Sequence, residues 1–209
     1  MDQRTDEWYQ ARLAKCTASR ISDVLAKIKF GEAATRRNYK IQLVTERLTN
    51  MKSEDSFMSV AMQNGIDREP IARQLFSERT GNIVTEVGFI DHPNIPYSGC
   101  SPDGVIESEN SILELKCPMD STMVDIWMNQ QVPSKWLPQI MFQLSVTGAK
   151  FCHFAAYSPN FPENLQLYIQ KVERDEDQIA LINKEVQLFL QEVEDIVNKL
   201  KGVKHGNTI

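Results

Sequence analysis

The sequence predicts an α/β protein in which a mixed central β-sheet is flanked by helices. Apolar residues recur at helical spacing near both ends of the chain, and short apolar runs typical of strands lie between them. The 209 residues suit a single domain with a substantial core. We expect one domain over 1–209, with a mainly helical region at 1–82, a sheet core at 83–172, and a helix with a tail at 173–209.

The helices are predicted from apolar periodicity and from their start and stop signals. Thr17 or Ser19 is expected to cap a helix that continues to about residue 28. Pro70 predicts a break near Glu69 in a later helix, and Asp120 is the expected cap of another. The predicted helical segments are 7–12, 17–28, 34–51, 59–80, 120–129, 138–147 and 175–201, with a loop at 53–58.

Short apolar runs bounded by turn residues predict the strands. These runs lie at 83–85, 88–91, 105–107, 112–117, 151–157 and 165–172. The polar turn 108–111 makes the third and fourth of them a β-hairpin.

The hairpin carries the residues with the clearest chemistry. Side chains alternate along a strand, so Glu114 and Lys116 share one face, while Leu113, Leu115 and Cys117 share the other. We expect the first face to display a carboxylate beside an ammonium and the second to be buried.

Asp103 lies in Ser-Pro-Asp-Gly just before the hairpin, which should bring it close to Glu114. Two converging carboxylates make a hard oxygen site that suits Mg²⁺ or Mn²⁺. Such an ion polarises a phosphoryl oxygen and activates water, and Lys116 one strand step away can stabilise the developing charge. The alternative is an ordinary surface hairpin, but the turn and the apolar partners favour the site.

The charge is unevenly distributed along the chain, whose formal net charge is −5. Residues 12–52 contain ten lysines and arginines against three acidic residues, whereas residues 173–195 contain eight acidic residues against two basic ones. This pattern suits a protein that holds a polyanion on one side. Two solvated helix faces would give the same pattern.

Other features exclude several classes of protein. No apolar run approaches the roughly 18 residues that a membrane span needs, and the first seven residues are polar, unlike a signal peptide. We therefore expect a cytoplasmic protein with no membrane contact. The four cysteines lack zinc-type spacing and are expected to be free thiols.

The motifs together resemble a known family. Asp103 followed by Glu114-Leu115-Lys116 matches the core of restriction-endonuclease-like nucleases. Ser-Pro-Asp-Gly, Leu-Glu-Leu-Lys-Cys-Pro and the segments 139–143 and 146–147 resemble the phage lambda exonuclease-like (YqaJ-type) viral recombinase family, from about residue 8 to about residue 177.

This resemblance implies a single nuclease domain with a restriction-endonuclease-like core. The expected activity is Mg²⁺-dependent 5′-to-3′ digestion of double-stranded DNA ends, with two ions and a 3′ overhang as product. Residues 1–82 would then bind the DNA end. The resemblance also implies a ring-shaped homotrimer, a single-strand annealing protein as partner, and a phage or prophage gene.

The resemblance also assigns the site residues. The expected metal ligands are Asp103, Glu114, Glu69 and the backbone carbonyl of Leu115, and Gln139 would hydrogen-bond near the attacking water. Gln143 is expected to be a structural or DNA-contacting neighbour. The expected 5′-phosphate pocket consists of Arg12, Ser19 and Ser101.

Two other readings remain open. A restriction-type or structure-specific endonuclease could use the same core and would cut closed circular DNA. A catalytically silent DNA-binding module is the other alternative, although the intact Asp, Glu and Lys set argues against it.

Overall fold

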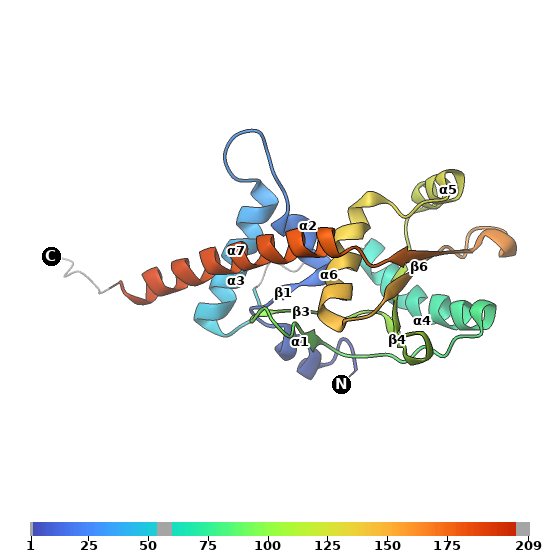
Figure 1. The fold of residues 1–209 in the computed structure, drawn as a ribbon, viewed down its shortest axis with the longest axis horizontal. Helices are drawn as coiled ribbons and strands as arrows, with labels where there is room; N and C mark the ends of the chain where they lie inside the picture. Colours follow the sequence, from blue (N-terminus) through green and yellow to red (C-terminus); the bar gives the residue numbers. More distant parts are fainter. Residues whose placement is uncertain (1, 54–59, 204–209) are drawn as a thin grey trace.

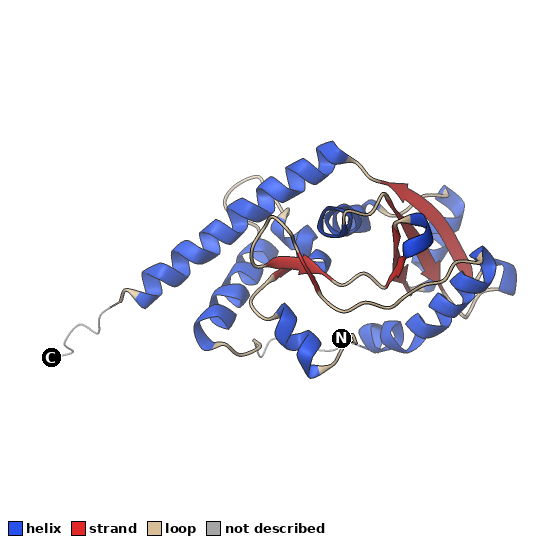
Figure 2. Ribbon diagram, turned by 60° about the horizontal axis from the view of Figure 1, so that its bottom comes forward, coloured by secondary structure: helices blue, strands red, loops and turns tan. Residues whose placement is uncertain are grey.

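A computed structural model describes residues 2–53 and 60–203, with the side chains of 60–62 left out. It confirms the predicted fold class, because a mixed four-stranded sheet lies between helices that cover both of its faces (Figures 1 and 2). The predicted loop at 53–58 falls almost wholly outside the described residues.

The main sheet has the order β4-β5-β6-β7. Its two outer pairs are antiparallel, and the central pair β5–β6 is parallel, with Glu114 opposite Phe154. A parallel pair needs a long crossover, which two helices provide here. The strands are β4 (Gly104–Ile106), β5 (Ser111–Lys116), β6 (Phe151–Tyr157) and β7 (Leu167–Glu173).

A second, smaller sheet was not predicted. It joins β1 (Cys16–Thr17), β3 (Ser98–Cys100) and β2 (Ile90–Asp91) in the order β1-β3-β2. The strand predicted at 83–85 is wrong, since only a single antiparallel bridge joins Thr85 to Val105. Two-residue strands such as β1 carry no alternation that a sequence pattern could detect.

The helices agree with the predicted positions, apart from the second. They are α1 (Asp6–Arg12), α2 (Ile21–Val24), α3 (Ala34–Thr49), α4 (Val60–Thr80), α5 (Asp120–Asn129), α6 (Leu137–Thr147) and α7 (Glu176–Lys201). Helix α2 follows a 3₁₀ turn at Ala18–Arg20 and ends at Val24.

Three details of the predicted helices are wrong. Ile28 is 55% exposed and lies outside any helix, so its apolar character does not mark a buried face. Neither Thr17 nor Ser19 caps α2 with its side chain. The carboxylate of Asp120 does not cap α5 and instead accepts hydrogen bonds from Ser158 (2.8 Å) and from Asn160 (2.9 Å).

The break predicted at Pro70 is also absent, because α4 runs continuously from Val60 to Thr80. Pro70 is exposed, whereas Ala72 and Phe76 are fully buried against the sheet. We infer that this packing offsets the hydrogen bond that proline removes. Glu69 thus projects from a helix that is held rigidly.

Apolar residues form a cluster on each face of the main sheet. Leu113 and Leu115 pack with Ala72 and Phe76 of α4, as the alternation in β5 predicts. On the opposite face, Ile112 and Phe154 belong to a cluster that includes residues of α6, α7 and α3. The largest buried side chains of this cluster are Tyr39, Phe142, Phe154 and Phe189. All four cysteines are free, as predicted.

The basic and acidic regions of the sequence neutralise each other across α3 and α7. Arg36 and Lys40 both pair with Glu192 at 2.8 Å, and Arg47 pairs with Glu194 at 2.7 Å. The hydrogen bond from Arg36 lowers the pKa of Glu192 to about 2. Much of the basic charge therefore stabilises the contact between two helices and is not available to a polyanion.

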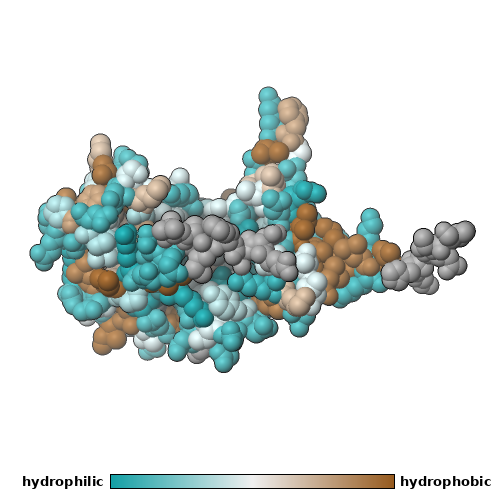
Figure 3. Space-filling view, turned by 180° about the vertical axis from the view of Figure 1, so that it is seen from behind, coloured by the Kyte–Doolittle hydropathy of each residue, from teal (hydrophilic) through white to brown (hydrophobic). Residues whose placement is uncertain are grey.

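Helix α7 extends beyond the body of the molecule (Figure 1). Seen from behind, hydrophobic side chains gather on this projecting part (Figure 3). Leu200 is 47% exposed and Val203 is 65% exposed at its end. Within the part of the chain that is described, no helix has the length and apolar character needed to cross a membrane.

Candidate active site

The hairpin of β4 and β5 places Asp103. Its N–H donates to the carbonyl of Leu113 (3.0 Å), and its Oδ2 accepts from the N–H of Leu115 (2.6 Å). Burial raises the pKa of Asp103 well above its usual range, and the charges of Glu114 and Glu69 raise it further. The predicted approach of Asp103 to Glu114 is therefore found in the structure.

The same geometry orients the backbone of Leu115. In a strand, the N–H and C=O of one residue point to the same side, so a residue whose N–H meets Asp103 also directs its carbonyl to that edge. The pairing of β4 with β5 stops at Gly104, which lies opposite Leu113. Leu115 lies beyond that point, so β4 does not cover its backbone. The Leu115 carbonyl therefore lies on the same edge of β5 as the carboxylate of Asp103.

Glu114 is held by three donors. Its Oε1 accepts from Lys116 and from Gln139 Nε2 (2.5 Å), and its Oε2 accepts from Gln143 Nε2 (2.6 Å). The expectation of a displayed carboxylate is wrong, because α6 covers this face and Glu114 is only 1% exposed. A carboxylate this deeply buried depends on its hydrogen bonds for a fixed orientation.

Lys116 shares the face of Glu114, as predicted, and keeps contact with solvent through a side chain that is 23% exposed. Its Nζ also donates to Gln139 Oε1 (3.2 Å). Burial opposes its charge, but Glu114 and Asp103 outweigh burial, and the pKa of Lys116 is raised. The ammonium thus stays charged beside two carboxylates.

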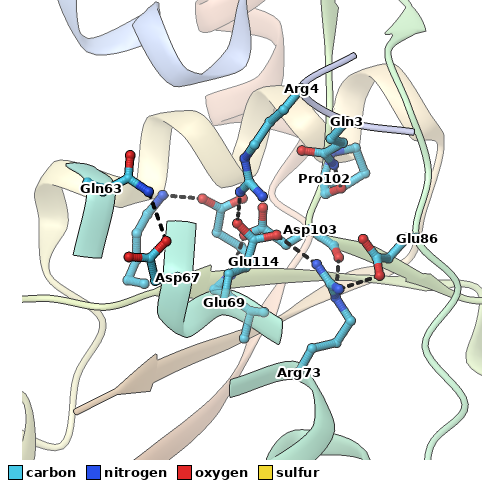
Figure 4. A network of polar contacts seen from close by, with 12 residues as sticks. Gln3, Arg4, Gln63, Asp67, Glu69, Arg73, Glu86, Pro102, Asp103 and Glu114 are labelled. Atoms are coloured by element: carbon cyan, nitrogen blue, oxygen red, sulfur yellow. Dashed lines mark hydrogen bonds and ion pairs between the residues drawn. The ribbon is translucent and has the colours of Figure 1, made fainter. Parts of the chain in front are cut away.

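Glu69 reaches the site from α4, and Figure 4 shows it beside Asp103 and Glu114. Its Oε1 accepts from Arg73 Nη2 (2.7 Å), and its Oε2 pairs with Arg4. Arg73 also donates from Nε to the Asp103 carbonyl (3.1 Å). Two arginines therefore hold Glu69 against the start of the hairpin.

These groups have the chemistry of a divalent-cation site. Three carboxylates and one strand carbonyl supply the hard oxygen donors that Mg²⁺ and Mn²⁺ prefer. The electrostatic effect of Glu114 and Glu69 on Asp103 indicates mutual repulsion that an added cation would relieve. As they stand, no three Asp, Glu, His or Cys side chains of the described residues form a ready-made ligand cluster.

A second polar group lies beside the hairpin. Ser101 Oγ accepts from Trp8 Nε1 (2.9 Å) and from Arg12 Nη1 (3.4 Å). The guanidinium of Arg12 lies 4.0 Å from the Trp8 ring centroid, and burial lowers the pKa of Arg12. An anion bound here would restore the solvation that the guanidinium has lost.

The structure joins Arg12 and Ser101 but not Ser19. Ser19 is exposed, and among the side-chain hydrogen bonds of the described residues its partner is Thr17 (3.3 Å). The α2 N-terminus cannot supply an extended anion site, because the helix spans only four residues. Ser19 in the pocket stays a prediction.

For four residues at the site, the role was not predicted from the sequence or was left open. Gln143 is fully buried and binds Glu114, so it is a structural neighbour rather than a DNA contact. Its spacing of four from Gln139 on one helix could have indicated a shared target. Arg4, Trp8 and Arg73 carry no motif, and only the folded chain shows their contacts.

Comparisons with known proteins identify the family. Residues 7–150 match the YqaJ-like viral recombinase domain. The chain belongs to this family. A search of curated proteins finds no significant match.

The chain is also similar to solved structures of exonucleases. The chain is 39% identical to LHK-Exo in a complex with dAMP, with a TM-score of 0.87 and coverage of 94% of this chain and 96% of that one. A second structure of this alkaline exonuclease, from Laribacter hongkongensis, gives 38% identity and a TM-score of 0.86 at the same coverage. A phage-related exonuclease from Haemophilus somnus 129PT shares the fold at 12% identity, with a TM-score of 0.72 and coverage of 89% and 96%.

Proposed function

We propose that this family member is a Mg²⁺-dependent exonuclease that digests double-stranded DNA ends in the 5′-to-3′ direction and leaves 3′ overhangs. The observation that carries the proposal is the meeting of Asp103, Glu114 and Lys116 at one hairpin edge. Glu69 lies beside them. Family membership and the similarity to alkaline exonucleases support the nuclease activity.

The carboxylates of Asp103, Glu114 and Glu69 and the carbonyl of Leu115 would hold Mg²⁺ or Mn²⁺, and we propose two ions. When bound, these ions would polarise the phosphoryl oxygen and make water a better nucleophile. The buried donors of α6 fix Glu114, and Arg73 fixes Glu69, so the ligands are oriented before substrate arrives.

Lys116 has a separate role in this scheme. Its partly exposed ammonium would orient the attacking water and stabilise the negative charge that develops on the phosphoryl oxygens. Gln139 bonds both Lys116 and Glu114, so it aligns the two groups on which this step depends. Its amide can also hydrogen-bond near the water.

The 5′ polarity would come from the Arg12 and Ser101 pocket. A terminal phosphate carries more charge than an internal one, and a desolvated arginine beside a hydroxyl recognises that difference. Ser19 is proposed as a further contact. The dAMP in the LHK-Exo structure supports the stepwise release of mononucleotides, which digestion from either end would give.

Four further properties are proposed, three of them from the family resemblance. The chain would form a ring-shaped homotrimer around DNA, and an annealing protein would receive the 3′ strand. A phage or prophage origin and a cytoplasmic location in the bacterial host accompany these. Sedimentation velocity tests the trimer, and a monomer at micromolar concentration would contradict it.

The activity is tested on a linear duplex labelled at either 5′ or 3′ ends, with a closed circular duplex as control. We expect the 5′ label to be released first as a mononucleotide, only with Mg²⁺, while circular DNA stays intact. Cutting of the circle would support the endonuclease alternative, and binding without digestion would support the silent module. Asp103→Asn, which keeps the hydrogen bond to Leu115, should digest nothing.

A further inference from the structure

Residues 2–5 lie across the candidate active site. Gln3 Nε2 donates to the carbonyls of Val87 (3.0 Å) and Pro102 (2.9 Å), one residue before Asp103. On the other side, Thr5 caps α1 by accepting from the N–H of Trp8. Arg4 is therefore held between two fixed points.

The backbone of Arg4 is unusual. Its φ of +69° lies in the left-handed region, which residues other than glycine seldom adopt. Such a conformation persists only where the surroundings determine it, and it is frequent at functional sites. Here the two anchors at Gln3 and Thr5 determine it, and the result is that the Arg4 side chain reaches Glu69 (Figure 4).

Glu69 has two arginine partners that differ in freedom. Arg73 is 11% exposed and is tied to three groups: Glu69, the Asp103 carbonyl and Glu86. Arg4 is 35% exposed and pairs with one oxygen, Glu69 Oε2. Of the two, Arg4 can leave without loss of the framework, because Arg73 continues to hold Oε1.

We propose that Arg4 is a further substrate-binding residue. It pairs with Glu69 in the cation-free protein, and once the carboxylates hold a divalent cation it would bind a backbone phosphate of the cut strand. This proposal rests on the proposed function, since it needs both the cation and the DNA strand.

The exchange follows from charge. A cation held at Glu69 would weaken the pair with Arg4, because two positive groups at this distance repel each other. A phosphate bound at the cation would be the nearest new anion, and the planar guanidinium fits phosphate oxygens in a bidentate manner. Arg4 and Arg12 belong to one short segment, so the same segment would hold two phosphates of one strand.

The experiment measures how DNA affinity depends on salt. Each phosphate contact contributes about 0.9 to the slope of log K against log salt. The probe is a 5′-phosphorylated duplex with phosphorothioate ends that resist digestion, and binding is measured in Ca²⁺ and in EDTA. The variants are Arg4→Gln and Arg4→Lys. The matched control Arg37→Gln removes the same charge from an exposed position on α3.

We expect Arg4→Gln to lower the slope by about 0.9 in Ca²⁺ and to leave it unchanged in EDTA. Arg4→Lys, which keeps the charge, should retain the wild-type slope in both. Any effect of Arg37→Gln should be the same in both buffers. An unchanged slope for Arg4→Gln in Ca²⁺ overturns the proposal, and so does an equal decrease in both buffers.

A second readout uses no DNA. Free Mn²⁺, followed by electron paramagnetic resonance, should bind Arg4→Gln about threefold more tightly than wild type, because a competing ion pair of modest strength has been removed. Equal Mn²⁺ affinity would contradict the competition. Failure of the proposed function has a different signature: wild-type protein would leave a linear duplex intact in Mg²⁺. The DNA-affinity and Mn²⁺ measurements on the Arg4 variants test only the Arg4 proposal.

Discussion

Gln143→Leu tests whether the orientation of Glu114 controls catalysis. Gln143 is fully buried, and its Nε2 donates to Glu114 Oε2 at 2.6 Å. Its own Oε1 is buried with no hydrogen-bond partner among the described residues. Leucine has a similar volume and removes both the useful donor and the unsatisfied acceptor.

These two losses act on stability in opposite directions. A hydrogen bond to a charged group contributes about 1.5–3 kcal/mol, and an unsatisfied buried acceptor costs about 1–3 kcal/mol. The difference between the two ranges limits the net change in the free energy of unfolding to about 2 kcal/mol, which is a shift of at most roughly 8 °C in Tm for a chain of this size. Glu114 would still lose one of its three fixed donors.

The rate of digestion should fall even though the protein stays folded. A misplacement of about 1 Å at a reacting centre costs up to about 100-fold in rate, so we expect digestion to slow by about 10- to 100-fold. Thermal unfolding and the release of labelled nucleotide measure the two effects separately. Wild-type digestion by Gln143→Leu would refute the idea that α6 orients Glu114.

Leu144→Ala on the same helix is the matched control. Leu144 is fully buried in the core and is absent from the hydrogen bonds of Glu114. It should lose about 2–5 kcal/mol of stability and keep its rate per folded molecule. A parallel loss of rate would indicate that α6 as a whole, rather than the Gln143 amide, sets the activity.

Other substitutions test the rest of the site and the fold. Because the pKa of Asp103 is raised, its protonated form favours folding, and that contribution is lost as pH rises through the raised pKa. Without divalent cations, Asp103→Asn should therefore have a higher Tm than wild type at about pH 8. This difference in Tm should vanish below about pH 4. A Tm below that of wild type at the higher pH would contradict the electrostatic account. Arg12→Ala should erase the preference for 5′-phosphorylated ends in competition digests, whereas an intact preference would remove Arg12 from the pocket. Gly99→Ala would bring a Cβ within 2.3 Å of the Ile90 carbonyl, and we expect urea denaturation to show a free energy of unfolding lower by about 1–3 kcal/mol.

The elements that the sequence predicts correctly are those with long periodic patterns. Helix α7 presents an apolar stripe over 26 residues, and leucines alternate with charged residues over 113–116 of β5, so both were placed to within a few residues. Strands of two residues, such as β1, contain no period at all. The continuity of α4 through Pro70 depends on tertiary packing, which local propensity does not contain.

Residues of the candidate site were predictable where chemistry and spacing coincide within one hairpin. Asp103, Glu114 and Lys116 are close in sequence, and their convergence follows from strand pairing alone. The burial of Glu114 was missed, because it depends on α6 packing over β5, and Gln143 of α6 is 29 positions from Glu114 in the sequence. The cancellation of basic charge by α7 was missed for the same reason, since Arg36 and Glu192 are 156 positions apart.

The choice of donors around the carboxylates has a consequence for the cation. Glu114 is oriented by two neutral amides, from Gln139 and Gln143, and by the single charge of Lys116. An arginine in place of Gln143 would hold the carboxylate equally well but would add a second fixed positive charge and repel a divalent ion. Neutral amides supply orientation without that charge. At Glu69 the positive charges are Arg73, which holds Oε1, and the more exposed Arg4 at Oε2. In the proposed exchange Arg4 is the one that leaves when the cation binds.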